Sequence, residues 1–127
     1  DRHGGGRNHV LEILQAFNVV PLHTEMVAIN LVNTLKAHEV AFGIAKSFGL
    51  PPELCSAHRT TAAIHIQGWL PQPDFVVWSN TICFSMSKNG ELIRSLWDVP
   101  GFFVEHPYRR TPADISFLAL SQTEWVR

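Results

Sequence analysis

Short apolar runs alternate with segments of helical spacing along this chain, and this alternation limits the possible folds more than any other feature. The clearest strand is predicted at Phe75–Trp78, and similar runs occur at Val19–Leu22 and Phe102–Val104. Strands separated by helices favour a parallel sheet, because parallel neighbours need long crossover connections. The sequence therefore predicts an α/β domain whose open, mainly parallel sheet has about three to four strands flanked by helices, as in Rossmann-like or flavodoxin-like folds.

The predicted helices have recognisable start and stop residues. Apolar residues recur at helical steps from Glu25 to Phe48, where Gly49 ends the pattern and Pro51-Pro52 prevent its continuation. A last helix is predicted to start at Thr111-Pro112-Ala113-Asp114, which offers an N-cap, a first-turn proline and an acid at the third position. Shorter helices are expected at His9–Phe17 and Thr60–Trp69.

The segment from Thr81 to Leu96 permits two interpretations. Asn89-Gly90 between alternating apolar residues is the strongest local signal for a β-hairpin. The same segment also has a rough helical face, on which Gly90 costs about 1 kcal/mol relative to alanine. The local pattern slightly favours the hairpin. The resemblance described below favours a helix with Asn80 as its N-cap, and this is the structure that we expect.

Composition excludes several classes of protein. With 127 residues, 46% of them hydrophobic and only 17% charged, the chain has room for one domain with a modest core. The net charge is -1 and the basic residues are scattered, so no nucleic-acid surface is predicted. No apolar run approaches the roughly 20 residues of a membrane span. Without a signal-peptide core near the start, a cytoplasmic location with reduced cysteines is expected.

Polar residues gather where the predicted strands end. In an open parallel sheet, ligands bind beyond the carboxyl ends of the strands. The connection that carries Cys55 and Arg59 should emerge on the same side. The residues at the three strand ends are His23, Thr24, Glu25, Ser79, Asn80, Cys83, Glu105, His106 and Pro107. Taken alone, the two cysteines could equally be inert buried thiols, and Glu25 an acid favoured by a helix dipole.

Several segments, in order, resemble the 2-hydroxyacyl-CoA dehydratase and benzoyl-CoA reductase family. Leu50-Pro-Pro-Glu-Leu-Cys55-Ser-Ala-His-Arg59 is similar to its first cysteine motif, in which Cys-Ser is followed by two residues and Arg. Pro73-Asp-Phe-Val-Val-Trp-Ser-Asn80-Thr-Ile-Cys83 resembles the second, where an Asn-x-x-Cys turn leads from a strand into a helix. Val99–Pro107 is similar to the strand that follows, and Leu11–Glu25 to the opening segment with its Pro-x-x-x-Glu.

The resemblance implies chemistry on acyl-CoA thioesters by one-electron steps. Family members hold a four-iron, four-sulfur (4Fe-4S) cluster between two α/β domains, and an ATP-dependent activator protein supplies the electron. Residues 1–127 would be a single α/β domain, the N-terminal cluster-binding half of a longer two-domain subunit that acts with a homologous partner subunit. The reaction would be radical dehydration of a 2-hydroxyacyl-CoA, as in a lyase, or reduction of an aromatic acyl-CoA, as in an oxidoreductase.

The resemblance also implies roles for individual residues. Cys55 and Cys83 match cluster ligands, whose sulfur atoms must then lie within roughly 6 to 7 Å of one another. Ser56, Arg59 and Asn80 match the turns that present the cysteines, so Ser56 and Asn80 would be cofactor-binding residues. The catalytic residues that we expect are Glu25 and Arg59.

Two departures from the family pattern leave alternatives open. Phe84 stands where many relatives have an Asp after the second cysteine, and the further cysteine ligand of the family would come from outside this sequence. The cluster would therefore be shared with residues outside the chain. One alternative is a non-catalytic assembly subunit of such a complex. Another is a plain α/β binding module in which the cysteines are structural.

Overall fold

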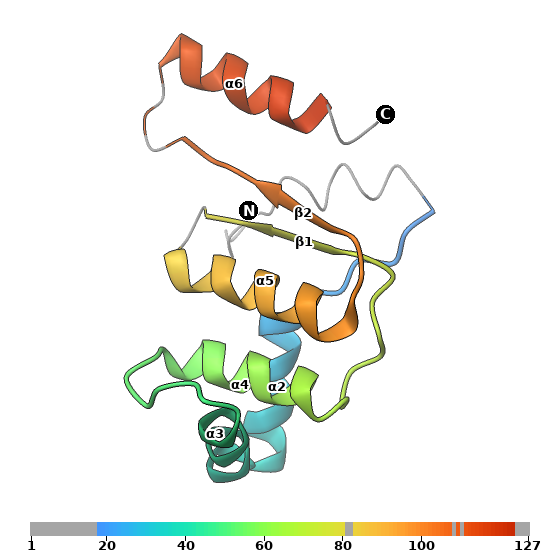
Figure 1. The fold of residues 1–127 in the computed structure, drawn as a ribbon, viewed down its shortest axis with the longest axis vertical. Coiled ribbons are helices and arrows are strands. Elements are labelled where there is room, and N and C mark those ends of the chain that lie inside the picture. Colours follow the sequence, from blue (N-terminus) through green and yellow to red (C-terminus); the bar gives the residue numbers. More distant parts are fainter. Residues whose placement is uncertain (1–17, 81–82, 108, 110, 124–127) are drawn as a thin grey trace, which may run out of the picture.

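The computed structural model describes residues 18–80, 83–107, 109 and 111–123, and shows helices on either side of a small parallel sheet (Figure 1). The predicted helix at His9–Phe17 lies outside the described residues. The elements are α2 (Thr24–Leu35), α3 (His38–Ser47), α4 (Ser56–Ile66), β1 (Val76–Ser79), α5 (Phe84–Trp97), β2 (Gly101–Val104) and α6 (Pro112–Thr123).

The sheet pairs β1 with β2 in parallel, with Val76 opposite Gly101 and Ser79 opposite Val104. Helix α5 is the crossover between the two strands, so the predicted α/β class and the parallel pairing are confirmed. The predicted third strand at Val19–Leu22 is wrong, since the described sheet has two strands. Pro21 has no N–H to donate to a ladder and Val20 is 94% exposed, so this run is extended chain outside the sheet.

Helix α5 confirms the helical interpretation over Phe84–Leu96 and shows that the hairpin signal was misleading. Gly90 is buried against Trp78, and a Cβ atom at this position would lie 2.2 Å from Trp78 Cγ. The preceding Asn89 is also buried, and its Nδ2 donates to the carbonyl of His58, 3.2 Å away on α4. The Asn-Gly pair therefore serves the packing of a helix between β1 and α4.

The single long helix predicted from Glu25 to Phe48 is wrong, because the chain breaks into α2 and α3 at Lys36. Lys36 has a left-handed backbone with φ 52°, and its N–H donates to the carbonyl of Asn33. His38 Nε2 lies 2.7 Å from Asn33 Oδ1 and links the two helices across the break. The change of direction lets α2 and α3 both pack on α4. Gly49, with φ 99°, follows the end of α3 as predicted.

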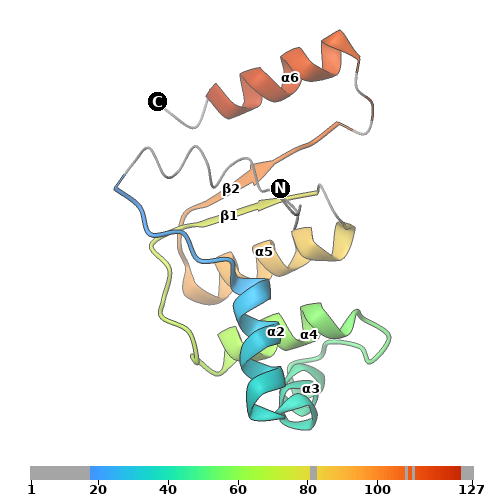
Figure 2. The same ribbon diagram turned by 180° about the vertical axis from the view of Figure 1, so that it is seen from behind.

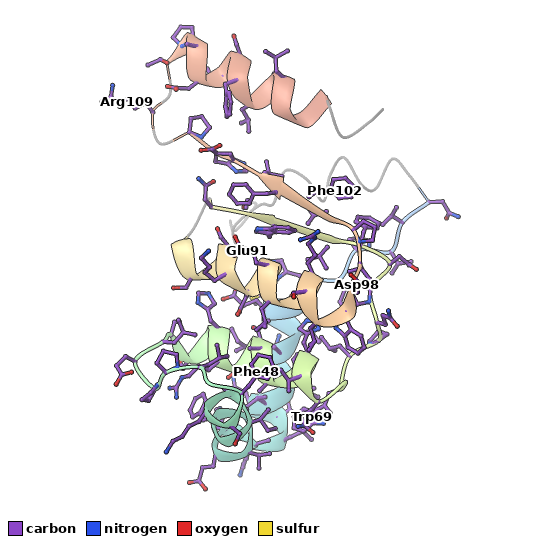
Figure 3. All side chains as sticks on the ribbon, in the orientation of Figure 1. Phe48, Trp69, Glu91, Asp98, Phe102 and Arg109 are labelled. Carbon is purple, nitrogen blue, oxygen red and sulfur yellow. The ribbon has the colours of Figure 1, made fainter. Side chains whose placement is uncertain are left out.

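Helix α4 lies at the centre of the fold, between α3 and α5, and α2 crosses one of its faces (Figure 2). It begins at Ser56, earlier than the predicted Thr60, and ends at Ile66. Every residue from Thr60 to His65 is buried. The core beside α4 consists of small and branched side chains, namely Ala28, Val32, Ala41, Ala63 and Ile64. Figure 3 shows how side chains fill the space between these layers.

Helix α6 begins with the predicted capping box. The backbone N–H of Thr111 donates to Asp114 Oδ2 at 2.9 Å, and the backbone N–H of Asp114 donates back to Thr111 Oγ1 at 3.3 Å. The hydrogen bonds from Thr111 lower the pKa of Asp114.

Beyond this cap, α6 lies apart from the other layers in Figure 1 and exposes apolar side chains. The most exposed are Ile115, Phe117 and Leu120. No described helix has both the length and the apolar character of a membrane span.

His65 is expected to make the fold sensitive to mild acid. Its side chain is 2% exposed, neither ring nitrogen has a hydrogen-bond partner among the described residues, and burial lowers its pKa from the usual 6.5. Above pH 6.5 this histidine is neutral in both the folded and the unfolded chain. As the pH falls below that value, the unfolded chain binds the proton first, so the free energy of unfolding decreases until the folded pKa is reached.

His65→Leu is therefore expected to flatten this decrease and to raise the free energy of unfolding at pH 7.5 by about 1 kcal/mol, because it removes two unpaired buried nitrogens. Urea unfolding at pH 7.5 and pH 5.5 of both chains measures the effect. His38→Leu is the control, because His38 is exposed and bonded to Asn33. An equal loss of stability with acid in His65→Leu and in the wild type would contradict the prediction.

Candidate functional site

The two cysteines occupy equivalent places in the fold. Cys55 is the N-cap residue of α4 and Cys83 is the N-cap residue of α5, and neither side chain makes a capping hydrogen bond. Both thiols are free; Cys55 is exposed and Cys83 is half-buried. Helices α4 and α5 pack together and begin at the same end of the molecule in both views (Figures 1 and 2).

The carboxyl ends of the strands lie at this same edge, as predicted for a parallel sheet. Asn80 directly follows β1, and its side chain joins the segment that follows β2. The backbone N–H of His106 donates to Asn80 Oδ1 at 2.7 Å, and Asn80 Nδ2 donates to the His106 carbonyl at 3.3 Å. The predicted N-cap role of Asn80 is wrong, because both ends of its amide are used in this bridge and Cys83 takes the N-cap position.

A buried histidine connects three helices beside Cys83. His58 lies in the first turn of α4 and is 2% exposed. Its Nε2 lies 3.7 Å from Cys83 Sγ and 3.8 Å from Glu25 Oε1, which belongs to the first turn of α2. The structure thus brings Glu25 and Cys83 together as the sequence predicted, through a residue that sequence reasoning did not select. The available signal was its spacing, since His58 follows Cys55 by one helical turn.

The geometry around His58 differs from that of a nucleophilic relay. In such a relay the thiol and the carboxylate contact opposite ring nitrogens of the histidine, so that a proton can pass between them. Here Cys83 and Glu25 both approach Nε2, while Nδ1 is buried without a hydrogen-bond partner among the described residues. His58 Nε2 is therefore within hydrogen-bonding distance of the Cys83 sulfur, while the Glu25 carboxylate lies nearby at 3.8 Å, beyond hydrogen-bonding distance.

The side chain of Arg59 contacts Phe42 and the backbone of Leu54. Its guanidinium carbon lies 4.2 Å from the centre of the Phe42 ring, and its Nε donates to the Leu54 carbonyl at 3.1 Å. These contacts hold the turn that presents Cys55. Ser56 is exposed at the first position of α4, where the backbone N–H has no partner inside the helix. The catalytic role of Arg59 and the cofactor-binding role of Ser56 remain predictions.

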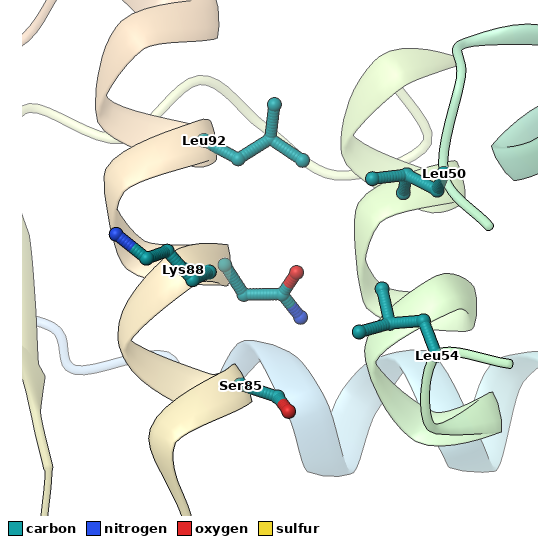
Figure 4. A pocket seen from close by; sticks show the side chains of 6 residues that line it. Leu50, Leu54, Ser85, Lys88 and Leu92 are labelled. Atoms are coloured by element: carbon teal, nitrogen blue, oxygen red, sulfur yellow. The ribbon is translucent and has the colours of Figure 1, made fainter.

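A shallow groove of about 210 Å³ lies between the turn before Cys55 and helix α5 (Figure 4). Leu50 and Leu54 face Leu92 across it, and Lys88 stands at its side. Lys88 Nζ contacts Glu91 at 2.9 Å. The groove is mainly apolar, and it adjoins the two segments that carry the cysteines.

Within the part of the chain that the structure describes, no group of three or more His, Cys, Asp or Glu side chains is placed to hold a metal ion. Glu25, His58 and Cys83 are close to one another, but they are not arranged as a complete ligand set. A metal centre at this edge would therefore need ligands from outside the described residues.

Comparison with known proteins identifies a family. The sequence model of a family described as "2-hydroxyglutaryl-CoA dehydratase, D-component" matches residues 10–124. No curated protein and no solved structure matches the chain.

Proposed function

Because the chain belongs to the 2-hydroxyglutaryl-CoA dehydratase D-component family, we propose that it is part of a 2-hydroxyacyl-CoA dehydratase subunit in which Cys55 and Cys83 bind an iron–sulfur cluster. One observation carries the proposal. The two free thiols stand at the N-termini of neighbouring helices, beside the carboxyl ends of the parallel strands. Ligands of open α/β sheets bind at such an edge.

The chemistry of these residues fits a cluster that is completed from elsewhere. Cysteine thiolates are the usual protein ligands of iron–sulfur clusters. Cys55 is exposed, so a metal centre bound to it remains open to ligands from another domain or subunit. The two sulfur atoms alone are an incomplete set. The two cysteines therefore fit one part of a cluster site that is shared with another domain or subunit, as the resemblance to the wider family implies.

When bound, such a cluster supplies one-electron chemistry to an acyl-CoA thioester, and a position without a protein ligand can take a substrate oxygen. The residues of this chain position and surround it. Arg59 holds the turn before Cys55, and the unpaired amide of Ser56 is available to a cluster sulfur. The Asn80–His106 bridge fixes the strand ends. The carboxylate of Glu25, which is 23% exposed, can accept a proton from a bound substrate.

The proposal includes partners. A homologous partner subunit or domain would supply the missing ligands, and an ATP-dependent activator protein would deliver the electron. The exposed apolar side chains of Ile115, Phe117 and Leu120 on α6 support a chain that does not act alone. Phe102 and Phe103, both about two-fifths exposed, are further exposed apolar side chains on opposite faces of β2 (Figure 3 labels Phe102).

Iron and acid-labile sulfide analysis under anaerobic conditions tests the proposal directly. The native assembly that contains this chain should hold both elements and absorb visible light. Cys55→Ala and Cys83→Ala should each remove most of the iron, because loss of one thiolate leaves the cluster open to solvent. Ser95→Ala, at an exposed position of α5, is the control and should keep the full iron content. A double Cys-to-Ala variant that kept its iron and its visible absorbance would show that the ligands lie elsewhere.

A further inference from the structure

His58 stands in a fixed position between the two cysteine-bearing helices. Its side chain is 3% exposed, and its backbone carbonyl accepts a hydrogen bond from Asn89 Nδ2 on α5. The ring thus sits in the first turn of α4, against the first turn of α2 and the start of α5. A ring held by three helices keeps its orientation, so the direction of its donor nitrogen is set by the fold.

The partners of the ring decide which nitrogen carries the proton. Nε2 faces two acceptors, Cys83 Sγ at 3.7 Å and Glu25 Oε1 at 3.8 Å. Nδ1 is buried and has no hydrogen-bond partner among the described residues. A buried N–H without an acceptor costs about 1 to 3 kcal/mol, so a proton on Nδ1 is disfavoured. A proton on Nε2 fits the contacts of both ring nitrogens, and with the proton there His58 donates toward the sulfur of Cys83.

We propose that His58 is a positioning residue that donates a hydrogen bond to the sulfur of Cys83 and thereby raises the reduction potential of the cluster bound there. This inference rests on the proposed function. A reduced cluster carries one more negative charge, part of it on the sulfur ligands, so the positive end of an N–H dipole stabilises the reduced form more than the oxidised form.

Glu25 opposes this effect at the same nitrogen. Its carboxylate lies 3.8 Å from Nε2, which is too far for a hydrogen bond, but it places a negative charge beside the ring and the proposed cluster ligand. Its side chain is 23% exposed, whereas that of His58 is 3% exposed, so Glu25 is the easier of the two to replace without loss of the fold. Removal of the histidine donor and removal of the carboxylate should therefore shift the reduction potential in opposite directions.

The test is an anaerobic redox titration of the complete assembly, followed by visible absorbance, with iron content measured in parallel. In His58→Leu, reduction should become about tenfold less favourable, because a hydrogen bond to a charged group is lost; for a one-electron couple this is a fall of about 59 mV. His58→Gln should stay close to the wild type, because its amide can donate from nearly the same place. Glu25→Gln should be easier to reduce than the wild type.

Nitrogen-15 NMR of the histidine rings in the metal-free chain gives a second readout. The expected result is a proton on Nε2 of His58, and a ring that carries its proton on Nδ1 instead would overturn the assignment. Full iron content with an unchanged potential in His58→Leu would overturn the inference alone. A wild-type assembly without iron would overturn the proposed function and this inference with it. If His58→Leu does not fold, the test rests on Glu25→Gln. A reduction potential of the cluster in Glu25→Gln equal to that of the wild type would count against the inference.

Discussion

Gly90→Ala is expected to lower the free energy of unfolding by about 1 to 3 kcal/mol, although alanine is ordinarily the better residue in a helix. A Cβ atom at this position would lie 2.2 Å from Trp78 Cγ and 2.5 Å from Trp78 Cβ. These atoms stand next to the backbone of β1 and cannot swing away as the end of a flexible side chain can. Helix and strand would have to separate, and the contact between α5 and β1 would weaken.

Gly43→Ala is the matched control for this prediction. Gly43 also lies inside a helix, α3, but it is exposed and a Cβ atom there meets nothing within 4 Å. Its replacement should stabilise the chain by up to about 1 kcal/mol through helix propensity alone. Urea unfolding of the two variants measures the difference. In a Gly90→Ala, Trp78→Gly double variant, which removes the Cβ and Cγ atoms of residue 78, the penalty at Gly90 should shrink. Equal effects of the two alanines on stability would mean that the tight contact is absent.

This glycine also shows where a local sequence rule fails. Asn89-Gly90 has the composition of a hairpin turn, and the rule considers only neighbours along the chain. The structure uses both residues for contacts with segments far away in the sequence, Asn89 with His58 and Gly90 with Trp78. The family resemblance predicted the helix correctly because it includes such distant requirements, which a short window cannot contain.

Other differences between the predicted and the observed elements also depend on contacts between residues far apart in the sequence. Apolar spacing continues across Lys36, so no pattern could predict the left-handed residue that turns α3 toward α4. The run Val19–Leu22 has the composition of a strand, but a strand needs a paired neighbour and the described chain provides none for it. By contrast, the capping box at Thr111 and Asp114 was predictable, because its atoms are three residues apart and need no distant partner.

For the candidate site, sequence reasoning located the edge but not its internal arrangement. The motifs placed Cys55, Cys83 and Asn80 near the strand and helix ends where the structure has them. Asn80 was predicted to cap the helix that follows it, but its amide binds the segment after β2. His58 was passed over because its spacing of one helical turn from Cys55 does not indicate a contact with Cys83, which only the packing of three helices shows.

Ile64→Ala is expected to lower the free energy of unfolding by about 2 to 5 kcal/mol, which is the largest effect predicted for a single side chain. Ile64 is 0% exposed and belongs to the core cluster of α4 with Ala28, Val32, Ala41 and Ala63. Three of the four buried partners of Ile64 in this cluster are alanines, whose side chains cannot move into the space left by three lost carbon atoms, and the partly buried Ile44 and Leu70 beside the cluster can fill only part of it. A cavity would therefore persist, and its size would add to the lost burial.

Ile115→Ala is the matched comparison, because it makes the same change in a helix at a position that is 61% exposed. Its effect on the free energy of unfolding of the chain should stay within about 0.5 kcal/mol.

The two variants should also differ in how strongly the chain associates with a partner. If the apolar side of α6 is covered by a partner, Ile115→Ala should weaken association in sedimentation experiments, whereas Ile64→Ala should not, provided that the chain is kept folded. Equal losses of stability would contradict the buried position of Ile64, and unchanged association in Ile115→Ala would place the interface elsewhere.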